Sequence, residues 1–430
     1  MKGIAIIGAG IAGLHLGLYL QKRGIPCTIY TEKSADEVRR GQLSRLVMFF
    51  ESSRERNREL RTNHWDGQGG ESYHIDVHVK GLGELSSRGQ FRAPALGLDV
   101  RMVCSRLLDD FVTRGGALVV SGAIDARRLV SLGREHSLVV VASGTGELGT
   151  TFPRILSRCS WLEPQRRIFG GFFRGVGFSE RPGLGFHLVP GQGEIFEYPV
   201  LGPEGVSSSL MIEAIAGGVF SPLTTLVYEE NPFAFEAMLL DLLRQHAPAI
   251  ATRIDPSRFE MTSPLDYVQC SVLPAARRGY LALGNASFAL AVGDVFATHD
   301  PVCGQGANAA SRSAFVLGAM IEKQLLDGHP FDRGFCEAVD EDLWSIVGPS
   351  LEWTNAFLNP PTPTTMALLS AAARCPEVAD AFAANFDDPG EQWRILGSTD
   401  AVLSFLAGRG GAVCPCARAS ERVAHLDGIF

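Results

Sequence analysis

The sequence predicts an α/β protein in which a Rossmann-like domain is interleaved with a second domain built on an antiparallel β-sheet, followed by a helical C-terminal region. Three observations support this prediction. A glycine-rich stretch follows an apolar strand at the start of the chain, and residues 165–280 alternate β-branched and aromatic residues with glycine and proline turns. Residues 335–405 have a helical pattern. The 430 residues are enough for two or three domains.

We expect both domains to be discontinuous in the sequence. The predicted segments of the Rossmann-like domain are residues 1–65, 96–160 and 279–330. The predicted segments of the sheet domain are residues 66–95 and 161–278. The helical region is expected over residues 331–405, and residues 406–430 are expected to form a loosely ordered tail.

The first stretch of the chain predicts a dinucleotide site. Gly8, Gly10 and Gly13 form a G-x-G-x-x-G motif between an apolar strand and a helix over residues 14–21. In this motif the first glycine permits a tight turn, the second lets a pyrophosphate approach the backbone, and the third lets the helix pack on the strand. Glu32 ends the next strand, where a carboxylate can bind the ribose hydroxyls of an adenine nucleotide.

A second literal G-x-G-x-x-G motif occupies residues 144–149. We expect no second nucleotide site there, because residues 150–153 look extended and end in a proline. The helix whose N-terminus should hold the phosphate is therefore missing. The motif is instead expected to form a glycine turn against the adenosine half of the same cofactor.

The segment around residues 293–308 identifies the nucleotide. Asp294 follows a glycine and can accept hydrogen bonds from a ribityl chain. Further on, Gly304 and Gly306 expose N–H groups at the start of a helix predicted from about residue 307 to residue 321. Such N–H groups stabilise negative charge, for example near N1 and C2=O of a reduced flavin. The predicted cofactor is therefore FAD, bound by the Rossmann-like domain.

Arginines could add contacts to the cofactor phosphates. Arg101 stands at the start of a predicted helix, whose N-terminus already favours a phosphate. Residues 33–65 are rich in arginine and are either a solvated helix face or, at residues 39–45, a loop that passes close to the phosphates.

Composition excludes several other classes of function. The net charge of −8 disfavours nucleic acid and anionic membranes as partners, because both need a basic surface. No apolar run is long enough to span a membrane. The nine cysteines, with no export signal, predict reduced thiols in the cytoplasm. Cys414 and Cys416 form a C-P-C sequence without further ligands nearby, so no metal site is predicted.

Together these features resemble the flavin-dependent aromatic monooxygenases of the para-hydroxybenzoate hydroxylase fold. Within them, residues 3–395 are most similar to the two-component styrene and indole monooxygenases. The motifs that carry the resemblance are Gly8-x-Gly10-x-x-Gly13 with His15-Leu16-Gly17-Leu18, Tyr30-Thr31-Glu32, Asp99-x-Arg101, Pro190-Gly191-x-Gly193-Glu194, Glu197-x-Pro199, Arg253-Ile254-Asp255-Pro256, Gly293-Asp294, Asp300-Pro301-x-x-Gly304-Gln305-Gly306-Ala307-Asn308, Trp353-Thr354-Asn355 and Gln392-Trp393.

The resemblance implies an epoxidase component that receives reduced FAD from a separate NADH-dependent flavin reductase and uses O₂ through a flavin C4a-hydroperoxide. No protein side chain is expected to be catalytic, and a homodimer is left open. The implied cofactor-binding residues are Gly8, Gly10, Ile11, Ala12, Gly13, Glu32, Arg45, Arg101, Asp294, Pro301, Gly304, Gln305, Gly306, Ala307 and Asn308. The implied substrate-binding residues are Arg45, Val47, Phe49, Ile75, Ala95 and Pro301.

Two positions depart from the family pattern. The family usually has a small polar residue where Arg45 stands, and a histidine or methionine where Phe49 stands. An arginine facing the cavity is costly unless it is paired, so Arg45 is expected to turn to the flavin phosphates or to meet a polar substrate. Ile75 and Ala95 resemble the indole-oxidising branch more than the styrene-oxidising one. The predicted substrate is therefore a small aromatic alkene or indole.

Two other functions stay open at this point. The chain could be a single-component aromatic hydroxylase that reduces its own FAD with NAD(P)H, or a non-catalytic FAD carrier or redox partner subunit. His299, beside Asp300, is expected to be a turn residue near the flavin rather than a catalytic base.

Overall fold

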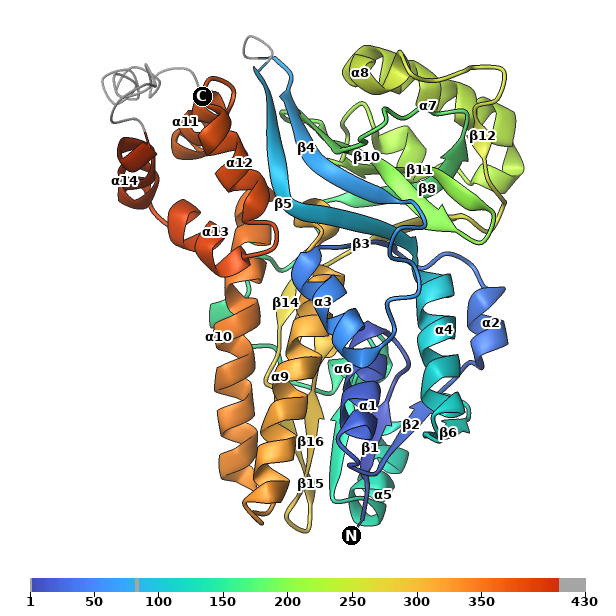
Figure 1. Cartoon of the computed structure of the whole chain (residues 1–430), viewed down its shortest axis with the longest axis vertical. Helices are drawn as coiled ribbons and strands as arrows, with labels where there is room; N and C mark the ends of the chain where they lie inside the picture. Colours follow the sequence, from blue (N-terminus) through green and yellow to red (C-terminus); the bar gives the residue numbers. More distant parts are fainter. Residues whose placement is uncertain (1, 82–84, 410–430) are drawn as a thin grey trace.

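The computed structural model describes residues 2–81 and 85–409. It has three parts (Figure 1): one sheet with its helices in the lower half of the view, a second sheet at the upper right, and helices α11–α14 at the upper left. Most of the expected tail, with Cys414 and Cys416, lies outside the described residues. The first residues of that segment instead end helix α14 (Thr399–Arg409).

The first sheet is the Rossmann-like one, as predicted. Its six described strands are, in order, β15 (Tyr280–Gly284), β16 (Ser287–Ala291), β7 (Leu138–Val141), β1 (Ile4–Ile7), β2 (Cys27–Thr31) and β6 (Ala117–Val120). All but β15 run parallel. β1 is an apolar run buried along its whole length, as expected for the centre of a parallel sheet.

Helices cover the first sheet. They are α1 (Ile11–Lys22), α4 (Val100–Thr113), α5 (Ala126–Glu135), α9 (Gly306–Leu326) and α10 (Arg333–Phe357). α1 begins three residues earlier than predicted, since Gly10 is its N-cap with an extended backbone. Two short helices, α2 (Ala35–Arg39) and α3 (Glu51–Leu60), lie in the arginine-rich segment. They flank strand β3 (Leu46–Phe49), so the segment is not one continuous helix.

The second sheet is mostly antiparallel. Its described strands follow the order β12 (Glu260–Met261), β8 (Arg167–Arg174), β11 (Gly205–Ala214), β10 (Gly193–Gly202), β9 (Leu184–Val189), β4 (Glu71–Val79), β5 (Leu85–Asp99) and β3, and β13 (Tyr267–Ser271) also pairs with β8. β3 had been expected in the Rossmann-like domain. It joins the second sheet because it pairs antiparallel with the end of β5, with Leu46 opposite Asp99. Helices α7 (Pro232–His246) and α8 (Pro248–Ala251) accompany this sheet, and the Asn231 side chain caps the start of α7.

The C-terminal region is helical, as predicted. It consists of α10, α11 (Pro363–Ala372), α12 (Pro376–Ala384), α13 (Pro389–Leu396) and α14. α12 lies directly on β5, where a Cβ atom on Gly89 would be only 2.1 Å from the carbonyl oxygen of Ala379. Trp353 of α10 is fully buried and packs edge-on against Phe386, with ring centroids 4.9 Å apart. The helical region is therefore part of one packed core with the second sheet.

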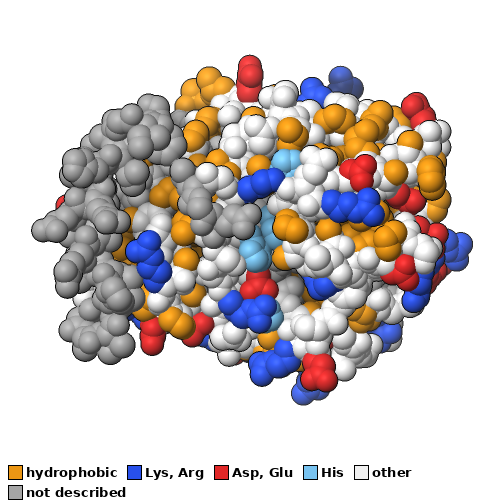
Figure 2. Space-filling model, turned by 90° about the horizontal axis from the view of Figure 1, so that it is seen from above, with side chains coloured by type: hydrophobic (Ala, Val, Ile, Leu, Met, Phe, Trp, Pro, Cys, Tyr) orange, Lys and Arg blue, Asp and Glu red, His pale blue; other side chains and the backbone are white. Residues whose placement is uncertain are grey.

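Among the helices of residues 2–81 and 85–409, none is long and apolar enough to cross a membrane. On the upper face of the molecule (Figure 2), basic and acidic side chains alternate with apolar ones. Histidines gather near its centre, beside Lys and Arg side chains. A polar pocket in the second sheet, which includes His74, Asp76, His187 and Arg253, contrasts with the apolar cavity described below.

Candidate active site

A groove runs over the carboxyl ends of the first sheet, where nucleotides bind in folds of this type. We call it the nucleotide groove. It is lined by the β1–α1 turn, the loop before β3, the start of α4, the end of β7 and the start of α9. The predicted cofactor residues in its lining are Gly8, Gly10, Ile11, Ala12, Arg45, Arg101, Asp294, Gly306 and Ala307.

The three glycines of the first motif have distinct surroundings. Gly8 has φ +114°, and a Cβ atom there would be 2.4 Å from the carbonyl oxygen of Ala142. A Cβ atom on Gly13 would be 2.0 Å from the carbonyl oxygen of Gly8, so α1 can pack this closely only with glycine. Gly10 instead faces open space, with no heavy atom within 4 Å of a Cβ position. The turn thus leaves room where a pyrophosphate would approach the backbone, and these residues fit FAD.

Two other predicted residues have more specific positions. Glu32 follows β2 directly and is exposed, at the edge where an adenosine ribose would lie. Arg101 lines the groove, but its guanidinium already donates to Asp99, Asp266 and the carbonyl groups of Gly41 and Leu265. All five of its N–H groups have protein acceptors, so Arg101 shapes the groove rather than offering a free donor to a phosphate.

The turn before α9 is built as the sequence predicts, but its amide side chains serve the protein. Gly304 has φ +61° and Gly306 faces open space. Asn308 is buried, and its Nδ2 donates to the carbonyl oxygens of Met48 and Gly304, both at 3.0 Å. Its Oδ1 accepts from the backbone N–H of Phe50 at 3.1 Å. Gln305 donates to the carbonyl oxygen of Phe386 at 3.0 Å. Both side chains therefore brace the turn.

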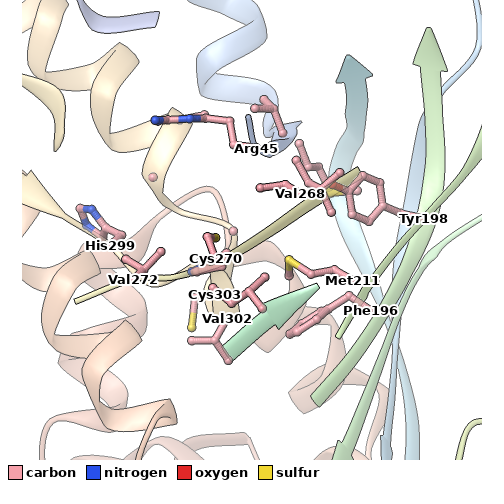
Figure 3. A pocket seen from close by; sticks show the side chains of 18 of the residues that line it. Arg45, Phe196, Tyr198, Met211, Val268, Cys270, Val272, His299, Val302 and Cys303 are labelled. Carbon is pink, nitrogen blue, oxygen red and sulfur yellow. The ribbon is translucent and has the colours of Figure 1, made fainter. Parts of the chain in front are cut away.

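A second hollow, the apolar cavity, lies between this turn and the second sheet, with a volume of about 280 Å³. That volume is near the lower end of the range for small-molecule pockets. The apolar side chains in its lining are Leu46, Val47, Met48, Phe50, Ile75, Ile168, Leu184, Phe186, Phe196, Tyr198, Met211, Val268, Val272, Pro301, Val302, Ala307 and Phe386. In Figure 3, Arg45 and His299 lie on one side of the cavity and Phe196, Tyr198 and Met211 on the other.

The cavity lining contains some of the predicted substrate residues and lacks others. Arg45, Val47, Ile75 and Pro301 line the apolar cavity, whereas Phe49 and Ala95 do not. Met48 and Phe50, on either side of Phe49, pack in the cluster around the cavity. Phe49 packs instead into the core of the Rossmann-like domain. Ala95, fully buried in β5, packs within the cluster around the cavity without reaching its surface.

The groove and the cavity meet at an ion pair. Both are lined by Ser44, Arg45, Asp294, Gly306 and Ala307. Arg45 Nη1 donates to Asp294 Oδ2 at 2.7 Å, with half of the Arg45 side chain exposed. The ion pair compensates the positive charge of Arg45, which would be costly if it faced the apolar cavity unpaired. A ring held at this junction would have one side in the groove and the other open to the cavity.

His299 is a buried, weakly basic side chain whose two ring nitrogens both have partners in the protein. Burial lowers the pKa of His299 to about 4, so its imidazole is neutral at pH 7. Its Nε2 lies 2.8 Å from the hydroxyl of Ser350, and its Nδ1 lies 3.2 Å from the carbonyl oxygen of Ala297. The side chain anchors the turn to α10 from the wall of the apolar cavity.

The second glycine motif forms part of the same groove. Ser143 and Gly144 line it, next to the β1–α1 turn. A short helix, α6 (Glu147–Thr150), follows. The sequence had predicted an extended segment from residue 150. The difference arises because the N–H groups of Thr151 and Phe152 bond back to the carbonyl oxygens of Leu148 and Gly149. At four residues, α6 is still too short to supply the phosphate-binding helix of a second nucleotide site.

Comparison with known proteins agrees with this geometry. Residues 144–253 match the family model "Styrene monooxygenase A putative substrate binding domain". The chain is 32% identical over 405 residues to styrene monooxygenase StyA of Pseudomonas fluorescens, a match that covers 93% of this chain and 96% of the relative. A relative of the same name from Pseudomonas sp. has the same identity and coverage.

Solved structures share the fold at low identity. A flavoprotein/dehydrogenase from Cytophaga hutchinsonii has a TM-score of 0.65 at 15% identity, covering 94% of this chain and 98% of its own. The flavin-dependent brominase Bmp2 has a TM-score of 0.62 at 12% identity, covering 91% of this chain and 98% of its own. At these identities the likeness concerns the fold.

The contrast between two glycines tests the nucleotide groove. We expect Gly10→Ala to fold normally, because its Cβ would enter open space, yet to weaken FAD binding about tenfold by filling the place of the pyrophosphate. Gly13→Ala should instead lower stability by about 1–3 kcal/mol through the clash with Gly8. Flavin fluorescence titration and thermal melts measure both. Equal FAD affinity for Gly10→Ala and the unmodified protein would contradict the assignment.

Proposed function

This chain belongs to the styrene monooxygenase family and is a flavin monooxygenase, and from that premise we propose that it is the oxygenase of a two-component system. It would take reduced FAD from a separate NADH-dependent flavin reductase and use O₂ to oxygenate a small aromatic alkene or indole. The observation that carries the proposal is the meeting of the nucleotide groove and the apolar cavity at Arg45 and Asp294.

When bound in its reduced form, FAD would supply the electrons that activate O₂ at its C4a atom. The residues that would hold it are the β1–α1 turn, Glu32, Asp294 and the turn at Pro301–Cys303 with Gly304 and Gly306. The backbone N–H groups at the start of α9 would favour negative charge on the reduced ring.

The rest of the chain would orient the substrate and exclude water. Phe196 and Met211 from the second sheet and Ile75 from β4 form apolar walls that suit a flat hydrocarbon ring. Phe386, which follows α12, closes the cavity from the C-terminal side. Because His299 is a weak base and both of its ring nitrogens have partners, this geometry supports positioning and dehydration rather than acid–base catalysis.

Delivery of electrons by a partner is supported by the second glycine motif. Ser143 and Gly144 at its start line the same groove, and α6 is too short to hold a second dinucleotide. The described residues therefore offer no separate nicotinamide site built on that motif. A single-component hydroxylase is the alternative. It would oxidise NAD(P)H on its own when an aromatic substrate is added.

The proposal is tested by supplying the electrons chemically. Purified protein mixed with dithionite-reduced FAD, ¹⁸O₂ and styrene or indole, without NAD(P)H or reductase, should give product that carries one ¹⁸O atom. Release of peroxide alone across a panel of small arenes would refute the substrate class. Substrate-stimulated NAD(P)H oxidation without a reductase would select the single-component alternative.

Two substitutions at one wall position test the apolar cavity. Met211→Trp should fill the cavity, so that FAD still binds but product formation falls at least about tenfold and peroxide rises. Met211→Ala perturbs the same strand position but enlarges the cavity, and it should keep most of the product yield. Product and peroxide are measured together. If both variants lose product equally, the wall position matters only for stability.

A further inference from the structure

Beside the apolar cavity lies a buried group of ionisable side chains that binding and oxygenation do not explain. It contains Glu213 of β11, Glu194 of β10, Arg166 before β8, and Asp300, which precedes the Pro301–Cys303 turn, called the flavin turn below. Both Glu213 and Asp300 are fully buried, at 0% exposure. We call these four residues the acid cluster.

The only cation of the acid cluster is already committed to one of its three carboxyl groups. Arg166 Nε and Nη2 donate to the two oxygens of Glu194, at 2.8 and 2.9 Å. Its Nη1 donates to the carbonyl oxygens of Gln165 and Leu358. Glu213 lies directly opposite Glu194 across the β10–β11 ladder, where a second negative charge would be repelled.

Three carboxyl oxygens in the acid cluster have no partner while the acids are ionised. They are both oxygens of Glu213 and Oδ2 of Asp300. Asp300 Oδ1 accepts from the backbone N–H of Val302 at 3.1 Å, which fixes the turn. Two facing buried carboxylates repel each other. If one of them is protonated, its O–H group donates a hydrogen bond to the other, and both side chains then have a partner. Accordingly, burial and the neighbouring Asp300 raise the pKa of Glu213 well above its usual value.

We propose that Glu213 is a positioning residue that stays protonated and donates a hydrogen bond to Asp300, holding the Pro301–Cys303 turn against the second sheet. The inference deepens the proposed function, because this turn would carry the flavin ring. Met211, two residues from Glu213 on the same face of β11, lines the apolar cavity. The contact therefore fixes the distance between the flavin turn and the wall that orients the substrate.

The proton gives the contact a defined pH dependence. The titratable or charged groups that face Glu213 are Asp300, Glu194 and Arg166, and Cys303 lies beside it. The unfolded chain ionises Glu213 near pH 4.3, whereas the folded chain keeps its proton to higher pH. Between these two pH values the folded state binds more protons than the unfolded state. The folding equilibrium constant therefore falls as the pH rises through this range, by up to about tenfold per pH unit.

Melting curves of the flavin-free protein between pH 6 and 9 test the proton directly. Glu213→Gln keeps a donor for Asp300 but cannot ionise, so its Tm relative to the unmodified protein should rise steadily with pH. Glu204→Gln is the matched control, since Glu204 is an exposed acid in the turn between the same two strands. Its Tm should follow the unmodified protein at every pH. Parallel curves for Glu213→Gln and the unmodified protein would overturn the proposal.

Binding of oxidised FAD tests the effect on the turn. Glu213→Gln should bind within about threefold of the unmodified protein, whereas Glu213→Leu, which leaves Asp300 without a donor, should bind at least about tenfold more weakly. Unchanged affinity of the folded Glu213→Leu variant would overturn the positioning role. If the unmodified protein binds no FAD, the proposed function fails, while the melting curves still decide the Glu213–Asp300 contact.

Discussion

The side chain of Asn308 connects the two halves of the active site. It lies at the start of α9 in the Rossmann-like domain, yet it bonds to Met48 and Phe50, which belong to or adjoin β3 of the second sheet. Each of these buried hydrogen bonds costs about 1–3 kcal/mol when one partner is left unsatisfied. Because β3 also pairs with β5, the bonds set the position of the flavin turn relative to the sheet that walls the apolar cavity. The meeting of groove and cavity depends on this link.

Local sequence predicted the parts of the site that local geometry determines. The turn at Gly8 and Gly10 and the turn before α9 need particular backbone conformations and open space, and such needs leave glycines at fixed spacings. The side chain of Phe49 could not be placed this way. A shift of one residue along a strand exchanges its two faces, and only the pairing of β3 with β5 decides which face meets the cavity.

Residues that meet only in three dimensions were missed. Phe196 and Met211 come from the middle of strands in a sheet assembled from distant segments, and no motif marks them. A weak signal did exist for the acid cluster. Glu213 stands two positions from Met211 in the otherwise apolar second half of β11, residues 210–214. An acid therefore falls on the buried face, which natural sheets tolerate only when it has a partner. That partner, Asp300, lies 87 positions further along the chain and becomes visible only in the fold.

The central claim is that the groove and the cavity form one site, with a flavin ring at the Arg45–Asp294 junction. A crystal structure of the protein with FAD bound measures this most directly. The account predicts the pyrophosphate at Gly10 and the isoalloxazine ring against the turn before α9, with one face open to the cavity lined by Phe196 and Met211. A flavin ring bound away from that turn, or with the apolar cavity closed off from it, would contradict the account.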